Sequence, residues 1–143
     1  MIYLGVVGSR ERNSDADKQA LKSALEAYLW GKNVKHFTFV SGGCYRGADQ
    51  FIKQLCKELV PHMQHEFPLI EILPNLPSNT SVYEKTVYGK FVQAYYDRNF
   101  KIAAVADYLF ALVKNKNDIF DGGTGNTCMQ FIDLKGREKL ILV

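Results

Sequence analysis

Three glycine-rich segments of the sequence combine small residues with hydroxyl and basic side chains. Glycine lets backbone N–H groups approach an anion without a Cβ in the way. An arginine beside such a turn can pair with a phosphate or carboxylate through two hydrogen bonds. These segments are therefore candidates for binding a phosphorylated ligand, and they are Gly8-Ser9-Arg10, Ser41-Gly42-Gly43-Cys44-Tyr45-Arg46-Gly47-Ala48-Asp49 and Gly122-Gly123-Thr124-Gly125-Asn126-Thr127.

Helical patterns follow the second and third segments, so each segment would open a helix. A helix N-terminus offers free N–H donors and partial positive charge, which makes residues 43–48 and 123–127 predicted phosphate-binding turns. Thr124 and Thr127 could add hydroxyl donors, and Arg10 and Arg46 could pair with the phosphate. The alternative is that such glycine-rich turns only end strands. That alternative would explain one such turn, but it explains three turns at one edge of the sheet less easily.

None of the segments has the full spacing of a dinucleotide-binding fingerprint, and no lysine follows a glycine loop as in a P-loop. An NAD dehydrogenase, a P-loop NTPase and a bound cofactor are therefore not expected. His62 and His65, with Cys56 upstream, are too sparse for a structural zinc site, so surface histidines are favoured and no metal is predicted. Cys44 has no histidine nearby in sequence, which disfavours a nucleophile.

Strand-like apolar runs alternate with helical patterns along the chain. Strands are predicted at residues 2–7, 37–40, 69–73, 107–113 and 140–143. Helices are predicted from Ser14, which forms a capping box with Asp17, at residues 48–59, at 82–104 with a candidate break near Asp97, and at 128–135. Residues 74–79 and 114–125 are predicted loops.

This alternation predicts an α/β fold, a Rossmann-like three-layer sandwich with a mostly parallel five-stranded sheet and helices on both faces. Ligands of such sheets bind outside the carboxyl ends of the strands, where the glycine-rich segments fall. Residues 1–143 are expected to form a single domain.

Composition and charge limit the classes of function. The chain has 143 residues, of which 47% are hydrophobic, and no apolar run approaches the roughly 20 residues of a membrane helix. Three widely spaced cysteines are typical of reduced thiols, so a cytoplasmic protein is expected. The net charge of +3 comes from scattered basic residues, so nucleic acid is not expected as a partner.

The order of the motifs resembles the SLOG superfamily, which groups the Rossmann-like domain of DprA/Smf, the LOG (Lonely Guy, lysine-decarboxylase-like) phosphoribohydrolases and small nucleotide-binding proteins from phages and bacterial conflict systems. The resemblance covers nearly the whole chain. It rests on the three glycine-rich segments together with Arg98-Asn99, Ile102 and Ala106-Asp107. It implies a pocket for a nucleotide or nucleotide derivative and a homo-oligomer.

The resemblance also assigns roles by position. Arg98 stands where LOG enzymes carry the functional arginine of an Arg-Lys motif, with Asn99 in place of the lysine. The glutamate that LOG enzymes carry after the last turn is replaced by Cys128-Met129-Gln130. The implied ligand-binding residues are Gly8, Ser9, Arg10, Ser41, Gly42, Gly43, Tyr45, Arg46, Gly47, Asn99, Gly122, Gly123, Thr124, Gly125, Asn126 and Thr127.

Cleavage of an N-glycosidic bond would need a carboxylate near the oxocarbenium-like centre. The candidate catalytic residues are Arg98, Asp49, Glu84 and Asp121. Each has another explanation: Asp49 could support the first turn of its helix, Asp121 could form a turn, Glu84 could lie on a solvated face, and Arg98 could form a surface ion pair.

Tyr45, Tyr95 and Tyr96 could stack on a base. Tyr95 follows Phe91 at helical spacing on a core stripe, so Tyr45 is the favoured stacking residue.

Three functions remain. The leading one is binding of a nucleotide or nucleotide-derived ligand by a sensor or sequestering protein. The second is a nucleoside 5′-monophosphate N-glycosidase, a LOG-like phosphoribohydrolase or transferase, which the missing glutamate weakens. The third is DprA-like binding of single-stranded DNA, which the scattered charge weakens.

Overall fold

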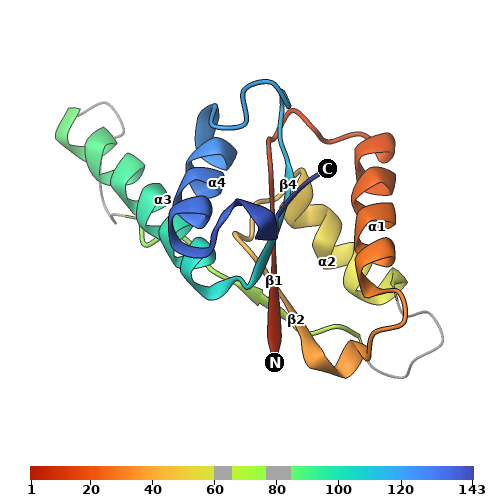
Figure 1. The fold of residues 1–143 in the computed structure, drawn as a ribbon. Helices are drawn as coiled ribbons and strands as arrows, with labels where there is room; N and C mark the ends of the chain where they lie inside the picture. Colours follow the sequence, from red (N-terminus) through yellow and green to blue (C-terminus); the bar gives the residue numbers. More distant parts are fainter. Residues whose placement is uncertain (60–65, 77–84) are drawn as a thin grey trace.

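A five-stranded sheet forms the middle layer of the protein, in the order β3-β2-β1-β4-β5 (Figure 1). The computed structural model describes residues 1–59, 66–76 and 85–143, the last range with side chains from residue 91 onward. The strands are β1 (Ile2–Gly8), β2 (Phe37–Ser41), β3 (Leu69–Glu71), β4 (Tyr108–Leu112) and β5 (Leu140–Leu142). Every pairing between neighbouring strands is parallel.

The strand order changes direction at β1, because β2 and β3 lie on one side of it and β4 and β5 on the other. This central strand pairs with β2, where Leu4 lies opposite Phe39, and with β4, where Leu4 lies opposite Tyr108. The carboxyl ends of β1 and β4 therefore form the switch point, at which ligands of open α/β sheets bind.

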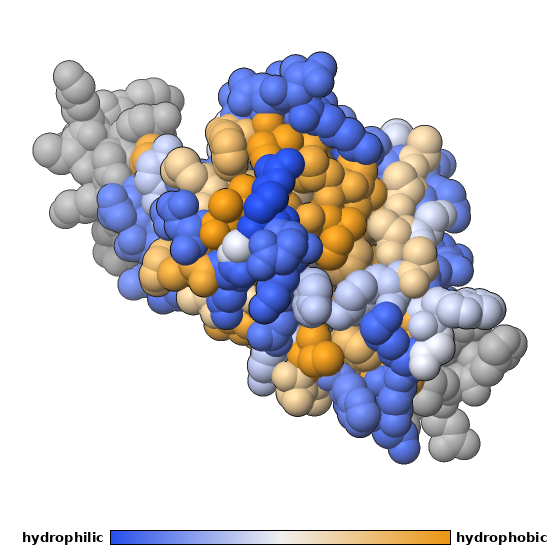
Figure 2. All heavy atoms as spheres, in the orientation of Figure 1, coloured by the Kyte–Doolittle hydropathy of each residue, from blue (hydrophilic) through white to orange (hydrophobic). Residues whose placement is uncertain are grey.

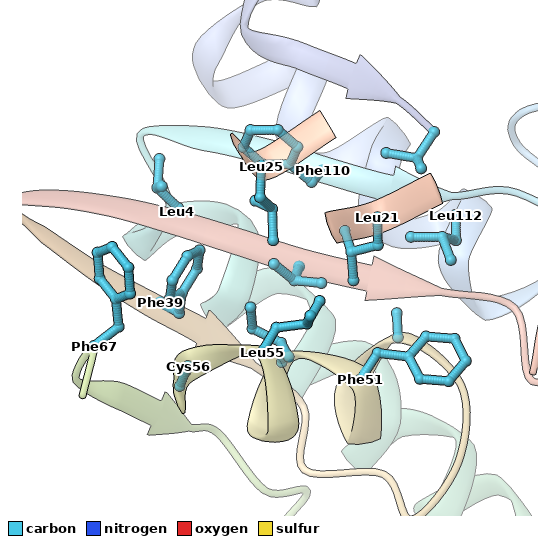
Figure 3. Packing of buried hydrophobic residues seen from close by; sticks show 14 of the residues in the cluster. Leu4, Leu21, Leu25, Phe39, Phe51, Leu55, Cys56, Phe67, Phe110 and Leu112 are labelled. Atoms are coloured by element: carbon cyan, nitrogen blue, oxygen red, sulfur yellow. The ribbon is translucent and has the colours of Figure 1, made fainter. Parts of the chain in front are cut away.

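Helices cover both faces of the sheet (Figure 1). The helices α1 (Asp15–Leu29) and α2 (Ala48–Glu58) pack on one face, where Leu21, Leu25 and Leu55 are fully buried against the strands (Figure 3). The helices α3 (Lys85–Val105) and α4 (Gly122–Lys135) pack on the other, through Ile102 and Phe131. The predicted Rossmann-like three-layer fold is confirmed, with a sheet that is wholly parallel rather than mostly so.

The start of α1 is as predicted. Ser14 is its N-cap, and the Ser14 hydroxyl and the Asp17 carboxylate satisfy each other's backbone N–H groups in a capping box. Asp17 also accepts a hydrogen bond from Arg12, whose guanidinium contacts the carbonyl oxygens of Val113 and Val143. The loop after β1 is thereby attached to the ends of β4 and β5.

The predicted start of α4 is wrong, because the helix begins at Gly122 and includes residues assigned to a loop. Glycines disfavour helix, but Asn99 on α3 donates hydrogen bonds to Gly123 and Asn126 and holds this turn in helical form. The Gly125 N–H donates to the Asp121 carbonyl oxygen, and a Cβ on Gly125 would collide with the backbone of Phe120. Farther along the helix, Cys128 and Phe131 are fully buried.

Two smaller differences concern α3 and β3. The helix α3 continues through Asp97 without a break, while the predicted residues 82–84 lie outside the described part of the chain. The strand β3 ends at Glu71 rather than at residue 73, because its partner β2 ends at Ser41, the residue opposite Glu71.

Hydrophobic side chains gather on the face between α1 and α4, around the C-terminal end of the chain (Figure 2). The strand β5 lies at this edge of the sheet, and its three residues are only half-buried. None of the helices in the described ranges is both long enough and apolar enough to span a membrane.

Candidate functional site

A cleft of about 700 Å³ opens at the carboxyl ends of β1, β2 and β4. It brings together segments that are far apart in the sequence, as the position predicted for a ligand in this fold requires. The candidate residues that line it are Gly8, Ser9, Arg10, Gly42, Gly43, Tyr45, Asp49, Arg98, Asn99, Asp121, Gly122, Gly123, Thr124 and Thr127.

The loop after β1 forms one wall of the cleft. The Ser9 N–H donates to the Leu112 carbonyl oxygen at 2.9 Å, which extends the pairing of β1 with β4. The Ser9 carbonyl oxygen accepts from the Arg12 N–H, closing a tight turn. Arg10 lies within this turn with an exposed side chain.

The turn between β2 and α2 forms the second wall. Asp49 Oδ2 accepts a hydrogen bond from the Cys44 N–H at 3.0 Å, so the carboxylate holds the turn that precedes its own helix. Burial raises the pKa of Asp49 above its usual value, although the N–H of Cys44 and the charge of Arg98 oppose this shift. Asp49 thus holds the turn that precedes α2 and lies in the first turn of that helix.

Arg98 and Asn99 on α3 connect the turn before α2 with the first turn of α4. The Arg98 guanidinium donates from Nη1 to the Gly42 carbonyl oxygen at 2.8 Å and from Nε to Asn99 Oδ1 at 3.1 Å. The Asn99 amide in turn donates to the Gly123 carbonyl oxygen at 3.4 Å and to Asn126 Oδ1 at 3.2 Å. Asn99 is only 6% exposed, so this connection lies beneath the cleft floor.

The N-terminus of α4 points its first turn at the cleft. Asp121 is the N-cap, but its side chain makes no capping hydrogen bond, and Gly122 and Gly123 are exposed. The first N–H groups of a helix have no partner within the helix, so these donors face the cleft. Thr124 lines the cleft too, whereas the Thr127 hydroxyl donates to the Gly123 carbonyl oxygen at 3.2 Å and is 2% exposed.

Three tyrosines lie at the cleft, Tyr45 in the turn before α2 and Tyr95 and Tyr96 on α3. The Tyr45 side chain is 76% exposed and that of Tyr96 46% exposed, while Tyr95 is half-buried with its ring 5.4 Å from the Arg98 guanidinium carbon. All three line the cleft. Tyr45 and Tyr96 therefore offer ring surface that a planar ligand could cover.

Several candidates lie beside the cleft rather than in it. Ser41 and Gly125 are buried, Gly47 caps α2, Asn126 is bonded to Asn99, and Arg46 is an exposed neighbour of Tyr45. Glu84, His62 and His65 lie outside the described residues. Within residues 1–59, 66–76 and 85–143, no three His, Cys, Asp or Glu side chains come together as a metal site requires.

Several residues that line the cleft are not among the predicted site residues, and they include Glu11, Leu73, Pro74 and Lys114. Glu11 and Lys114 form an ion pair of 3.2 Å between the loops after β1 and β4, and Leu73 and Pro74 follow β3. Only their position in the sequence could have indicated that they line the cleft, because each comes within three residues of the end of a strand on the ligand-binding edge.

Comparison with known proteins gives a similarity in structure. No protein-family model and no curated protein matches this sequence. Among solved structures, the chain is similar to DNA processing protein A (DprA) from Helicobacter pylori, with a TM-score of 0.57 and 18% identity over 99% of this chain. The chain has a DprA-like fold. It spans 64% of the length of that DprA chain, which is described as binding single-stranded DNA in a unique mode.

The DprA-like fold corrects the sequence-based prediction about partners. Nucleic acid was not expected because the basic residues are scattered along the sequence. That expectation is wrong, since a protein described as binding single-stranded DNA shares this fold. Scattered positions in the sequence do not prevent basic residues from meeting in the fold, since Arg10, Arg98 and Lys114 line one cleft.

Proposed function

We propose that the cleft binds a nucleotide, with a phosphate at the N-terminus of α4 and the base on the side of the tyrosines. The observation that carries this proposal is the convergence of a helix N-terminus with Arg10 and Arg98 on one cleft. Free N–H donors and the helix dipole favour an anion there, and arginine adds charge-assisted hydrogen bonds. A volume of about 700 Å³ is within the usual range for a small-molecule site.

The tyrosines support the second half of this proposal. A base stacked on an aromatic ring contributes ~1–3 kcal/mol, and this contribution depends little on which base is bound. The exposed rings of Tyr45 and Tyr96 are available for it, whereas the Tyr95 ring is already beside Arg98. Tyr45→Leu should therefore weaken binding of a nucleotide more than Tyr95→Leu does.

Single-stranded nucleic acid is the second candidate ligand. The DprA-like fold favours it, and so does the exposure of Tyr45 and Tyr96, because bases of a strand could continue past the cleft. In this case the nucleotide in the cleft would be one unit of a longer chain. The two candidates share the same phosphate position and differ in what extends from it.

A carboxylate placed at the proposed phosphate position tests the first candidate. A Cβ on Gly123 would meet open space, so Gly123→Asp should fold, and an acidic residue suits the first turn of a helix. The control is Ala16→Asp, because Ala16 occupies the same position relative to the N-cap in α1 and does not line the cleft. Calorimetric titration with nucleoside monophosphates should show a loss of about tenfold or more in affinity for Gly123→Asp only.

Equal affinities of Gly123→Asp and Ala16→Asp would contradict the proposed phosphate position. Chromatography of the same mixtures tests the N-glycosidase alternative, since release of a free base would mean cleavage rather than binding.

The second candidate is tested by salt dependence. Fluorescence anisotropy with a labelled single strand should give an affinity that falls with salt, with a slope set by the number of phosphates contacted. Binding of a strand no tighter than that of a mononucleotide would leave the free nucleotide as the ligand.

A further inference from the structure

We infer that the cleft selects its ligand by charge: the carboxylates of Glu11, Asp49 and Asp121 balance its basic groups and favour a singly charged phosphodiester over phosphomonoesters and polyphosphates. This inference rests on the proposed function and specifies the class of phosphate. The described residues that line the cleft include three basic side chains, Arg10, Arg98 and Lys114, and the same three carboxylates. Their formal charges sum to zero.

The first balanced pair is at the mouth of the cleft. Lys114 Nζ lies 3.2 Å from a carboxylate oxygen of Glu11, and both side chains are more than half exposed. A phosphate that approaches Lys114 must therefore compete with Glu11, and its own charge is repelled by that carboxylate. The repulsion increases with each further negative charge on the ligand.

The second balanced pair is on the floor of the cleft. A Cβ built on Gly42 would lie 2.9 Å from Arg98 Cζ and 3.1 Å from Asp49 Oδ2, so the guanidinium and the carboxylate face the same point. The Gly42 carbonyl oxygen and Asn99 Oδ1 already occupy two donors of Arg98. Arg98 therefore has part of its hydrogen-bonding capacity committed within the protein, and the nearby Asp49 carboxylate offsets its charge without a direct ion pair among the described residues.

The third carboxylate stands at the phosphate position itself. Asp121 is exposed at the N-cap of α4 and makes no capping bond to the helix. Among the described residues, no carboxylate lies within ion-pair distance of Arg10. The positive charges here are Arg10 and about half a unit of charge at the helix N-terminus, and the carboxylate of Asp121 offsets part of them. The small positive charge that remains matches an anion of low charge.

The experiment compares three ligands that share a nucleoside and differ in phosphate charge. They are a nucleoside 5′-(methyl phosphate), the 5′-monophosphate and the 5′-triphosphate, each with the four common bases. Calorimetry at about pH 8 keeps the monophosphate doubly charged, since its second pKa is about 6. The parent protein should bind the methyl ester most tightly and the triphosphate least tightly.

Glu11→Gln is the decisive variant. It should reduce the preference for the methyl ester over the monophosphate by about threefold at low salt, which is the size expected of an exposed carboxylate. Asp121→Asn retains a good N-cap and should act in the same direction. Glu26→Gln, an exposed carboxylate on α1 away from the cleft, should leave the preference unchanged.

The outcomes separate this inference from the proposed function. If the parent protein binds the triphosphate most tightly, or if Glu11→Gln leaves the preference unchanged, selection by charge is wrong while nucleotide binding stands. If no ligand of the series binds, both fail. A short single strand of DNA identifies the source of the diester: tighter binding than the methyl ester assigns it to a strand, and equal binding to a free small molecule.

Discussion

The Arg98 guanidinium donates a hydrogen bond of 2.8 Å to the carbonyl oxygen of Gly42, 56 residues earlier in the chain. The approach is so close that a Cβ on Gly42 would lie 2.9 Å from Arg98 Cζ. Gly42 is absent from the glycines with positive φ, so its small size rather than its backbone conformation is what the site requires. Gly42 provides the space in which Arg98 reaches the cleft.

Gly42→Ala should therefore displace Arg98 and weaken nucleotide binding. The loss of folding stability should be at most about 1 kcal/mol, because the displaced atoms are the end of a flexible side chain. A double-mutant cycle with Arg98→Ala measures this relationship: in the Arg98→Ala background, Gly42→Ala should cost no further affinity. The same loss in both backgrounds would show that Gly42 acts independently of Arg98.

Substitution of Asn99 should lower the stability of the fold more than substitution of an average helix residue does. Its amide group connects Arg98 with Gly123 and Asn126, and the residue is buried. Asn99→Ala should lower the free energy of unfolding by about 1–3 kcal/mol, because these partners lose a buried hydrogen bond. Asn99→Asp should cost more at neutral pH than in acid, since a carboxylate would face two oxygen atoms. Urea unfolding at both pH values measures the difference, and equal costs would contradict the arrangement.

Asp49→Asn should change how stability depends on pH. Burial raises the pKa of Asp49, so its ionisation costs the folded state free energy once the pH rises above the usual value of 3.8. The stability of Asp49→Asn relative to the parent should therefore increase as the pH rises from about 4 through the raised pKa, and then level off. Urea titrations at a series of pH values test the sign; a relative stability that falls over this interval would be inconsistent with a raised pKa.

Asp17→Asn should show the opposite trend. Burial alone would raise the pKa of Asp17, but hydrogen bonds from Arg12 and Ser14 outweigh it and lower the pKa below 3.8. The parent should thus be more stable than the variant by about 1 kcal/mol at neutral pH, the usual contribution of a cap. This advantage should disappear as the pH falls through the lowered pKa, whereas Asp15→Asn, an exposed position in the same turn, should show a smaller trend. Thermal unfolding monitored by circular dichroism at a series of pH values measures the stability difference between the parent and each variant.

Much of the framework could be predicted from the sequence because it depends on local signals. The capping box of α1 is visible in two residues, Ser14 and Asp17, three positions apart. The strands are short apolar runs, and the parallel topology then determines that the segments after β1, β2 and β4 meet at one edge.

The parts that could not be predicted depend on tertiary contacts. Nothing in the glycines of residues 122–125 favours a helix, and α4 extends through them because Asn99 and Phe120 pack against that turn. Glu11 and Lys114 belong to no motif and become partners only when their loops meet. Arg98 was found through a family resemblance, since its contact with Gly42 has no signature in spacing.

The connection made by Arg98 and Asn99 has a further consequence for motion. The turn before α2 and the first turn of α4 are attached to the same two consecutive residues of α3. We therefore expect local opening of one turn to loosen the other, so that the two behave as one cooperative unit. A ligand that orders either of these two turns should then protect both from amide hydrogen exchange. The N–H groups of Cys44 and Gly125 should slow together, although they belong to different segments of the chain.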